Sequence, residues 1–551
     1  MFFARILATA ALTASLVALP ACLAADDKPD AKTSADKSAD KSADKSTEKP
    51  APAEVTTQGD VVVGGQHIAY TAIAGTLTVG ATDAQDAQLG LDGKPQADSQ
   101  LSLDAPKEAK DAPPTARMFY VAYFKKDSKA EDRPITFLYN GGPGAATVWL
   151  HMGSVGPRHV VTDTDTHMPA APYKMVDNSN SLLDVTDLVF IDMPGTGFGR
   201  LTGKDAGKAF WGIDEDGNAF ARFIARFITK YERWNSPKFL FGESYGTTRS
   251  AVLADILENK QSIDLNGVIL LSQIFNFTTD IDFPTGNPGV DLPYVLALPT
   301  YAATAWYHKK LPTQPPALEP FLKEVEDFTN GPYAHALALG TDIGADEKQS
   351  VAEKLHEYTG LPVAYLLKAD LRVNGGEFEK TLQDDANLTT GRLDTRFSGP
   401  TMDPLSEGAD YDPQSAAISS AYVSLFNDYV RKTLKYGDGQ TYLPQAQFDG
   451  TPWDFKHHDN PVSVNVASDL AEAMKTNPRL KVMVNGGYYD LATPFFAAQY
   501  EEKHLPIPQS LAKNIEYDWY ESGHMVYVRD ESLKQLHDRV AAFITKTDTG
   551  E

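Results

Sequence analysis

The sequence predicts an α/β fold with a mostly parallel central sheet and an inserted helical cap. Six short apolar runs, each followed by a turn, are typical of parallel strands covered on both faces. They are residues 135–139, 188–192, 239–241, 268–271, 481–484 and 515–520. Between two of these runs, apolar residues recur at helical spacing from Phe220 to Tyr231. This alternation of strand and helix favours an α/β architecture.

Two further apolar segments precede these runs and predict antiparallel leading strands. Residues 60–72 alternate apolar and polar around a Gly64-Gly65 turn, and residues 118–124 form an aromatic-rich run. The polar segment 82–115 between them is interpreted as a surface excursion.

A block of helical stretches interrupts the alternation between residues 283 and 477. Its helices are expected at residues 292–311, 318–339, 348–358 and 416–436. An insertion between two core strands is expected to lie over their carboxyl ends, where α/β sheets bind ligands. We therefore predict an α/β core of residues 60–282 and 478–551, split by a cap of residues 283–477.

The N-terminus is typical of an exported chain. Residues 1–25 have a positive start at Arg5, a short apolar stretch and small residues around a cleavage site, which predicts a secretory signal peptide. An uncleaved anchor is the alternative, but about fifteen apolar residues are fewer than the roughly twenty of a spanning helix. Residues 19–22 resemble an imperfect bacterial lipobox, so lipidation at Cys22 is a second option. Residues 26–59 are a repetitive Ala-Asp-Lys-Ser tract, interpreted as a disordered linker.

Charge and cysteine usage exclude several functions. The net charge of −24 repels phosphate backbones, which argues against nucleic-acid binding. Cys22 is the single cysteine, so the folded part has no disulfide, thiol nucleophile or thiolate metal site. The expected location is the bacterial periplasm, either free or as a membrane-tethered lipoprotein.

The segment Gly242-Glu243-Ser244-Tyr245-Gly246 matches the nucleophile elbow, a sharp turn between a strand and a helix that exposes a serine. The apolar run 239–241 precedes it, and residues 247–258 are interpreted as the required helix. Because of this context, we interpret Ser244 as a catalytic nucleophile and not as an ordinary turn serine.

A serine nucleophile needs a base, and the base needs a carboxylate that orients it. Asp490 follows the predicted strand 481–484, and His524 follows the predicted strand 515–520. The chain order Ser, Asp, His is the order expected with this elbow. The other histidines, including the pair His457 and His458, are interpreted as structural or solvated.

The glycine-rich segment 140–144 follows the predicted strand 135–139. Enzymes with a nucleophile elbow take one oxyanion donor from this loop and the other from the residue after the serine. We assign the backbone N–H groups of Gly142 and Tyr245 to the oxyanion hole. A plain Gly-Pro turn is the competing interpretation.

At this point the sequence resembles the serine carboxypeptidase family of α/β-hydrolases. Six matching strings run in the family's order, at residues 137–144, 155–157, 191–198, 242–246, 485–490 and 523–525. The resemblance implies an α/β-hydrolase that removes the last residue of a peptide through an acyl-enzyme. It also implies that Asn140 and Glu243 hold the terminal carboxylate of the substrate.

In the family, the residues that hold the terminal carboxylate of the substrate form a carboxylate clamp. The sequence departs from the family at two positions of this clamp. Leu138 stands where the family has a tryptophan, and Ser154 stands where it has a glutamate that shares a proton with the elbow glutamate. These changes leave acyl transfer in place but put strict C-terminal specificity in question. Three arginines of the cap could supply a cation for a substrate carboxylate: Arg372, Arg392 and Arg396.

Three functions therefore remain open from the sequence. The first is an exported serine exopeptidase of carboxypeptidase type that acts on peptides. The second is an esterase or acyltransferase with the same triad, because one acyl-enzyme serves all three reactions. The third is a non-catalytic binding lipoprotein, which the complete triad argues against. No cofactor and no metal site is implied, and oligomeric state is left open.

Overall fold

The structure is a computed structural model that describes residues 53–96, 112–448, 450–458 and 464–548. The predicted signal peptide, Cys22 and all of the predicted linker up to residue 52 lie outside the described residues. The first strand begins at Glu54, so the predicted linker boundary at residue 59 is too late. Among the described residues, no helix is both long and apolar enough to cross a membrane.

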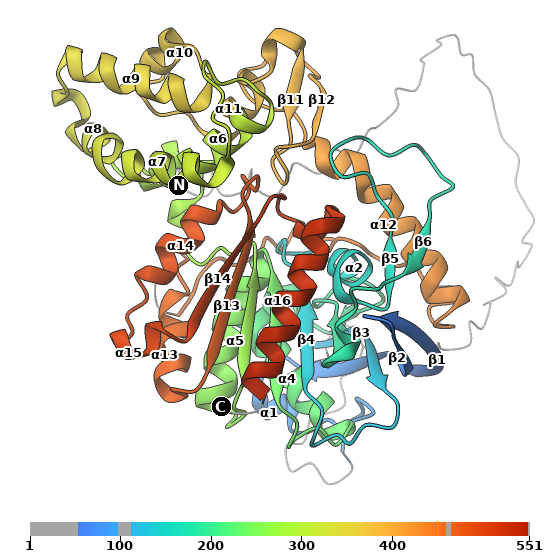
Figure 1. Cartoon of the computed structure of the whole chain (residues 1–551). Coiled ribbons are helices and arrows are strands. Elements are labelled where there is room, and N and C mark those ends of the chain that lie inside the picture. The colour runs from blue at the N-terminus through green and yellow to red at the C-terminus, as the bar shows by residue number, and fades with distance from the viewer. Residues whose placement is uncertain (1–52, 97–111, 449, 459–463, 549–551) are drawn as a thin grey trace, which may run out of the picture. The chain divides into compact units, whose positions relative to one another are not determined.

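A mixed sheet is the centre of the fold (Figure 1). Its strand order is β1-β2-β3-β7-β4-β9-β10-β13-β14, with β8 paired to β3. The bounds are β1 (Glu54–Val63), β2 (Gln66–Gly80), β3 (Thr115–Lys125), β4 (Ile135–Tyr139), β7 (Asp187–Ile191), β8 (Arg200–Thr202), β9 (Lys238–Glu243), β10 (Gly267–Leu271), β13 (Lys481–Gly487) and β14 (Ile515–Tyr520). Pairing is antiparallel from β1 to β7 and parallel from β7 to β14. The six predicted core strands are all present.

The register brings the carboxyl ends of the parallel strands to one edge. Gly242 of β9 pairs with Tyr139 of β4, and Glu243 pairs with Leu271 of β10. On the other side, Gly487 at the end of β13 pairs with Tyr520 at the end of β14. The loops that follow these strands therefore start at the same edge of the sheet.

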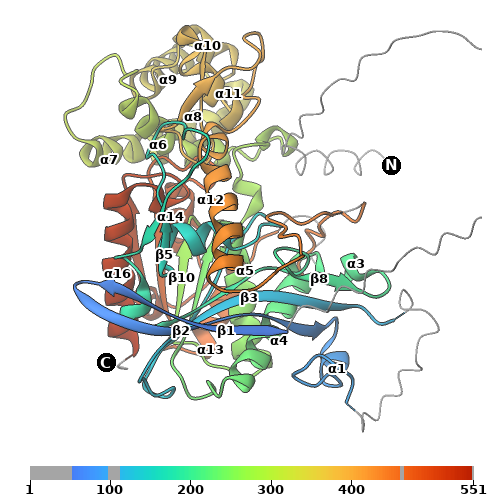
Figure 2. The same cartoon turned by 90° about the vertical axis from the view of Figure 1, so that its right-hand side faces the viewer.

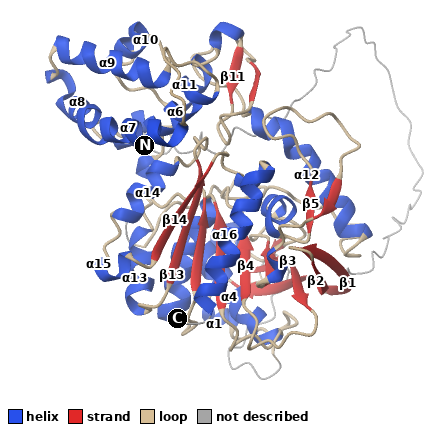
Figure 3. Ribbon diagram, viewed as in Figure 1, coloured by secondary structure: helices blue, strands red, loops and turns tan. Residues whose placement is uncertain are grey.

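Helices cover both faces of the sheet (Figure 2, Figure 3). On one face, α4 (Ile213–Lys230), α5 (Tyr245–Asp255) and α13 (Ala467–Thr476) pack on alternate strand residues such as Leu240. On the other face, α16 (Asp530–Asp548) and α12 (Pro413–Lys432) pack on the intervening residues such as Phe239 and Phe241. Because successive side chains of a strand point to opposite faces, both faces of an apolar run are buried.

The cap has an apolar core of its own and lies beyond the carboxyl ends of the strands (Figure 1). Its elements are α6 (Leu292–Tyr307), α7 (Leu318–Phe328), α8 (Ala334–Leu339), α9 (Ala345–Thr359), α10 (Val363–Lys368), α11 (Gly375–Thr381) and the short hairpin β11 (Leu388–Thr390) with β12 (Ser398–Pro400). The stretch predicted as one helix at 318–339 is two helices joined by a π-turn at Thr329–Tyr333, which contains Pro332. Proline lacks the N–H that a continuous α-helix needs.

The predicted cap is longer than the observed one. Residues of α12 belong to the core on one sheet face, and α13 packs against α5 on the other. The segment between them runs along the core, where Gln445 pairs with Ala145 and Asp454 pairs with Gly212. The sequence shows these helices as amphipathic, but it does not show which apolar surface each one covers.

Smaller elements complete the fold. They are α1 (Asp83–Asp86), α2 (Val148–Leu150), the π-turn η3 (His151–Val155), β5 (Arg158–Val160), β6 (Met175–Asp177), α3 (Ala206–Phe210), α14 (Phe495–Lys503) and α15 (Gln509–Ala512). The segment predicted as a surface excursion contains α1, and residues 97–111 of it lie outside the described part of the chain.

Candidate active site

Ser244 lies in the sharp turn between β9 and α5. Its backbone has φ 61° and ψ −132°, outside the conformations that a non-glycine residue ordinarily adopts. Its N–H donates to the carbonyl of Leu271 at 2.9 Å, which fixes the turn to β10. Ser244 is half-buried while Glu243 and Tyr245 on either side are buried. The turn thus presents this one side chain at the edge of the sheet.

His524 and Asp490 are hydrogen-bonded partners, although they come from different strand ends. The Nδ1 atom of His524 is 2.8 Å from Oδ2 of Asp490, and both side chains are buried. Thr493 holds the carboxylate as well, since its N–H donates to Oδ1 at 2.9 Å and its hydroxyl donates to Oδ2 at 2.7 Å. Asp490 therefore has a fixed orientation toward the imidazole. Sequence reasoning missed Thr493, although its spacing of three residues from Asp490 is typical of such a turn.

The environment of His524 favours its charged form. Burial lowers the pKa of His524, but the charge and hydrogen bond of Asp490 outweigh burial, so the pKa lies above its ordinary value. Glu243 acts in the same direction. An imidazolium that forms at this position is therefore stabilised by the protein.

The glycine loop after β4 packs directly on the elbow. A Cβ atom on Gly141 would overlap the backbone nitrogens of Tyr245 and Gly246. Gly142 has φ 111°, a conformation that side-chain-bearing residues rarely adopt. The backbone N–H groups of Gly142 and Tyr245, assigned to the oxyanion hole from the sequence, belong to these two adjoining segments.

Glu243 lies beside the His-Asp pair, and Asn140 and Glu243 share a partner, Tyr527. The hydroxyl of Tyr527 donates to Oε2 of Glu243 at 2.8 Å. Oδ1 of Asn140 accepts the Leu150 N–H at 2.9 Å, which orients its amide nitrogen away from that helix and toward other partners. Tyr527 was not predicted. The signal available was its place three residues after His524.

Burial raises the pKa of Glu243 to about 7. The charge of His524, the hydroxyl of Tyr527 and the amide of Asn140 oppose this rise, and the charge of Asp490 adds to it. Glu243 is therefore protonated through most of the acidic range. A protonated carboxyl can donate a hydrogen bond to an anion, whereas an ionised one repels it.

The two departures from the family pattern are both buried. Leu138 packs among apolar residues on the face of the sheet that α12 and α16 cover. Ser154 has a buried hydroxyl with no hydrogen-bond partner within the described residues. It also breaks the helical conformation of η3, with φ −108° and ψ −105°. Where the family has a second carboxyl group, this chain therefore has a small side chain. The hydroxyl of Tyr527 is the group that donates a hydrogen bond to Glu243.

The cap reaches the His-Asp pair through the loop 391–397 of the β11–β12 hairpin. The carbonyl of Leu393 accepts the His524 N–H at 2.7 Å, and the Thr395 N–H donates to the carbonyl of Tyr489 at 2.9 Å. Asp394 accepts the Gly523 N–H at 3.2 Å. Arg396 pairs with Asp394 at 2.5 Å and donates to Ser522 at 3.1 Å. The hairpin loop thus holds the loops of both Asp490 and His524.

The three arginines considered from the sequence have different partners. Arg372 pairs with Asp291 at 2.7 Å within the cap, and Arg396 forms its ion pair with Asp394. Arg392 pairs with Asp282 at 2.5 Å, yet 37% of its side chain is exposed. Its positive charge also acts on His524. Arg392 is the one of the three that combines exposure with proximity to the site.

A mixed sheet of this strand order, with an elbow serine and a paired histidine and aspartate at neighbouring strand ends, defines the α/β-hydrolase class. The particular family follows from the comparison with known sequences. The sequence profile described as "Serine carboxypeptidase" matches residues 109–538. The chain therefore belongs to the serine carboxypeptidase family, a class of serine-type hydrolases.

Individual relatives are distant. The chain is similar to the pheromone-processing carboxypeptidase KEX1 of Yarrowia lipolytica, with 27% identity over 145 residues, 26% of this chain and 22% of that protein. KEX1 of Saccharomyces cerevisiae is 31% identical over 135 residues, 23% of this chain and 17% of that protein. The alignments thus span about a fifth of the length of these relatives. A solved proline iminopeptidase from Mycobacterium smegmatis has 13% identity and a TM-score of 0.32, covering 79% of this chain and 96% of that chain.

Proposed function

We propose that the chain is an exported serine carboxypeptidase that uses Ser244, His524 and Asp490 as its triad. The observation that carries this proposal is the 2.8 Å pair of His524 and Asp490 at the strand ends next to the elbow of Ser244. Family membership over residues 109–538 supports the same class of reaction. The substrate is a peptide with a free C-terminus.

The reaction proceeds in two halves. The Ser244 hydroxyl oxygen attacks the carbonyl carbon of the last peptide bond while His524 accepts the hydroxyl proton. The negative charge on the carbonyl oxygen is stabilised by the N–H groups of Gly142 and Tyr245. His524 then gives its proton to the departing amine, and the C–N bond breaks. A water attacks the acyl-enzyme by the same route and releases the shortened peptide and the serine.

The terminal carboxylate of the substrate is held by Asn140 and Glu243. A neutral Glu243 can donate to the anion, and its pKa of about 7 keeps it neutral in acid. Tyr527 supports Glu243 in the place of the family's second carboxyl. On the cap side, the partly exposed Arg392 is paired with Asp282, so it can contact the substrate only through a guanidinium whose charge is already balanced.

An esterase or acyltransferase is the second candidate, and the altered clamp favours it. The hydroxyl of Ser154 has no hydrogen-bond partner within the described part of the chain, so this position gives the clamp no support. If Asn140, Glu243 and Tyr527 do not suffice, the same acyl-enzyme serves substrates without a carboxylate.

One experiment separates these candidates. A blocked dipeptide with a free C-terminus and its amidated twin are offered to the wild type and to Ser244→Ala at about pH 5 and pH 7.5. We expect Ser244→Ala to be inactive and the free acid to be strongly preferred by the wild type. Equal turnover of both peptides would put the esterase or acyltransferase first. Full activity of Ser244→Ala would reject the triad.

Export to a bacterial periplasm is proposed from the N-terminal sequence alone. Residues 1–25 supply the signal and Cys22 the lipidation site. Mass spectrometry of the mature N-terminus tests both. A lipid on Cys22 that disappears in Cys22→Ser supports the tethered form, and a mature chain beginning after residue 22 without lipid supports the free one. An uncleaved Met1 would reject export by this signal.

A further inference from the structure

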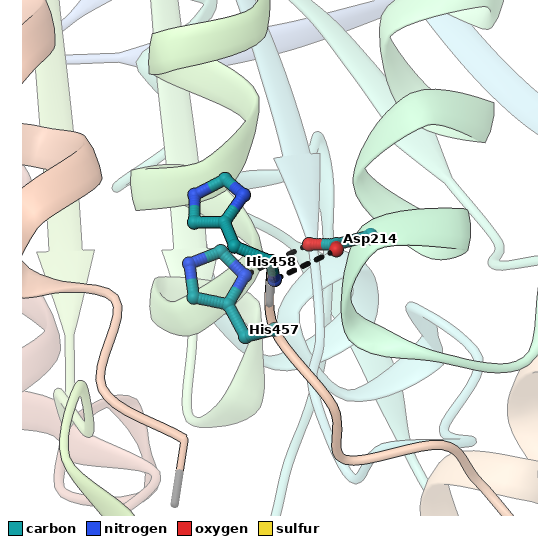
Figure 4. Close-up of side chains that lie close together, drawn as sticks. All are labelled: Asp214, His457 and His458. Carbon is teal, nitrogen blue, oxygen red and sulfur yellow. Dashed lines mark hydrogen bonds and ion pairs between the residues drawn. The ribbon is translucent and has the colours of Figure 1, made fainter. Parts of the chain in front are cut away.

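Asp214, His457 and His458 gather in a cluster that contains none of the candidate triad residues, and Asp469 joins them. Three of the four, Asp214, His457 and His458, offer donor atoms that all lie within 4.8 Å of one another. Figure 4 shows the two imidazole rings side by side, with the Asp214 carboxylate reaching toward them from α4. The ring centroids are 4.0 Å apart. This cluster, Asp214, His457, His458 and Asp469, is called the histidine cluster below.

Each carboxylate of the histidine cluster faces histidine nitrogens. Nδ1 of His457 is 2.8 Å from Oδ1 of Asp214, and Nε2 of His457 is 2.9 Å from Oδ2 of Asp469. Nε2 of His458 is 3.2 Å from Oδ1 of Asp469. Within the described residues, the ion pairs of both carboxylates are made with these two histidines. Asp469 is 2% exposed, so its charge is shielded from water.

This donor set suits a divalent transition metal. Two imidazole nitrogens and carboxylate oxygens are ligands of Zn²⁺, which holds N and O atoms at about 2.0–2.2 Å in a tetrahedron. Two ligand atoms on one such ion are about 3.4 Å apart. The distances from Asp469 to His457 and His458, 2.9 Å and 3.2 Å, are close to this spacing.

The surroundings of His457 match a second requirement of metal sites. A ligating histidine usually donates its other ring N–H to a carboxylate, which fixes its orientation. The two nitrogens of His457 face two different carboxylates, so an ion bound with one carboxylate leaves the other to accept that N–H. Asp214 also accepts the backbone N–H of His458 at 3.0 Å.

The backbone brings both rings to the same side. Neighbouring residues in an extended chain point to opposite sides, but His458 has φ 49°, in the left-handed region. For a residue other than glycine this conformation is unfavourable. It places His458 next to Asp469, the same carboxylate that His457 contacts.

We propose that the histidine cluster binds one Zn²⁺ ion. The ion is structural, because it joins the start of α4 to the start of α13 and to the loop before it, and the cluster includes none of Ser244, His524 and Asp490. α13 packs against α5, the helix that follows the elbow. With no cysteine in the described residues, the fold has no disulfide there, and the metal provides a crosslink between distant segments. This inference does not depend on the proposed peptidase activity.

The test is metal binding by the tag-free chain after removal of bound metal with a chelator. We expect one equivalent of Co²⁺ to produce the absorption of a tetrahedral site and Zn²⁺ to displace it. Zn²⁺ should raise the thermal midpoint by about 2 °C or more, and Mg²⁺ should not. His458→Gln and Asp469→Asn should weaken Co²⁺ binding about tenfold or more. His335→Gln, an exposed histidine elsewhere, should not.

His458 is the safer of the two positions to change, since 57% of its side chain is exposed. A cooperative thermal unfolding transition in each variant shows that the chain is folded. If the folded wild type binds no Co²⁺ or Zn²⁺, the proposal is wrong and the cluster is a set of hydrogen-bonded ion pairs without a metal. Binding that is unchanged in both His458→Gln and Asp469→Asn would also overturn it.

Discussion

Two buried Arg-Asp pairs contact the candidate active site, and they hold different parts of it. Arg249 pairs with Asp216 at 2.6 Å, with neither side chain exposed, and donates to the carbonyl of Asn140 at 2.7 Å. Its guanidinium lies 4.3 Å from the ring centre of Phe220. This pair joins α4, α5 and the glycine loop, and so it supports the part of the site that contains Ser244, the proposed nucleophile; this part is called the nucleophile half below.

The second pair, Arg396 with Asp394, belongs to the cap. Its members are two residues apart in the chain, and their partners, Ser522 and Gly523, precede His524. The nucleophile half is thus held by the core itself. The part with His524 and Asp490, the proposed base and its carboxylate, is called the acid-base half and is held by a loop of the inserted domain. The cap therefore holds the loop of His524, the proposed base, in addition to lying beyond the carboxyl ends of the strands.

The largest effect is expected when the acid-base half is broken at Asp490. Asp490→Asn keeps the size of the side chain but can no longer hold the imidazole in the correct tautomer. We expect kcat/KM to fall on the order of 10⁴-fold with the chain still folded. Peptide hydrolysis measures kcat/KM, and a urea unfolding curve shows whether the chain is still folded. A fall of less than tenfold would mean that another carboxylate orients His524.

Breaking the pair of Arg249 and Asp216, the core pair, should lower the free energy of unfolding more than breaking an exposed ion pair would. Arg249→Met leaves Asp216 buried without a partner, which costs about 3–5 kcal/mol in the free energy of unfolding. Arg372→Met is the matched control, because its pair with Asp291 is partly exposed and contributes under about 1 kcal/mol. Urea unfolding of both variants measures the difference. Similar losses for the two would contradict the role given to the core pair.

The cap pair should affect the reaction more than the stability. Arg396→Lys keeps the charge beside Asp394 but loses the planar fork that also reaches Ser522. We expect kcat to fall about tenfold, with KM unchanged and the acidic limb of the pH dependence shifted, because His524 is held less well. Arg249→Lys should instead lower stability while the folded fraction keeps its kcat. A change in KM alone would place Arg396 in substrate binding.

The smallest effect concerns the carboxylate clamp of the nucleophile half. Glu243, with its pKa of about 7, is neutral below this pH and ionised above it. Binding of a peptide with a free C-terminus should therefore weaken as the pH rises through about 7, by up to about tenfold per pH unit, because two carboxylates repel. Binding of the amidated peptide should not change. KM measured for both peptides from about pH 6 to pH 8 tests this. In Glu243→Gln, the KM values of the two peptides should depend on pH in the same way.

The positions of the candidate site residues were predictable where they follow from local sequence. Ser244 stands in a five-residue turn whose conformation depends on its own glycines and on the adjoining strand and helix. Asp490 and His524 each follow an apolar run, and parallel strands bring such ends to one edge whatever the loops contain. The sequence analysis did not find Thr493 or Tyr527, because each is recognisable only by the hydrogen bond that it makes to Asp490 or Glu243.

Sequence alone therefore determined the α/β architecture, the six core strands, the elbow and the order of the candidate triad, since these depend on residues near one another in the chain. Tertiary structure decided where the cap ends, that α12 and α13 belong to the core, and that the hairpin loop 391–397 holds the His524 loop. It also decided that Asp214 meets His457, 243 residues later in the chain. These contacts depend on which apolar surfaces pack together, and apolar patterning specifies that a face is buried but not its partner.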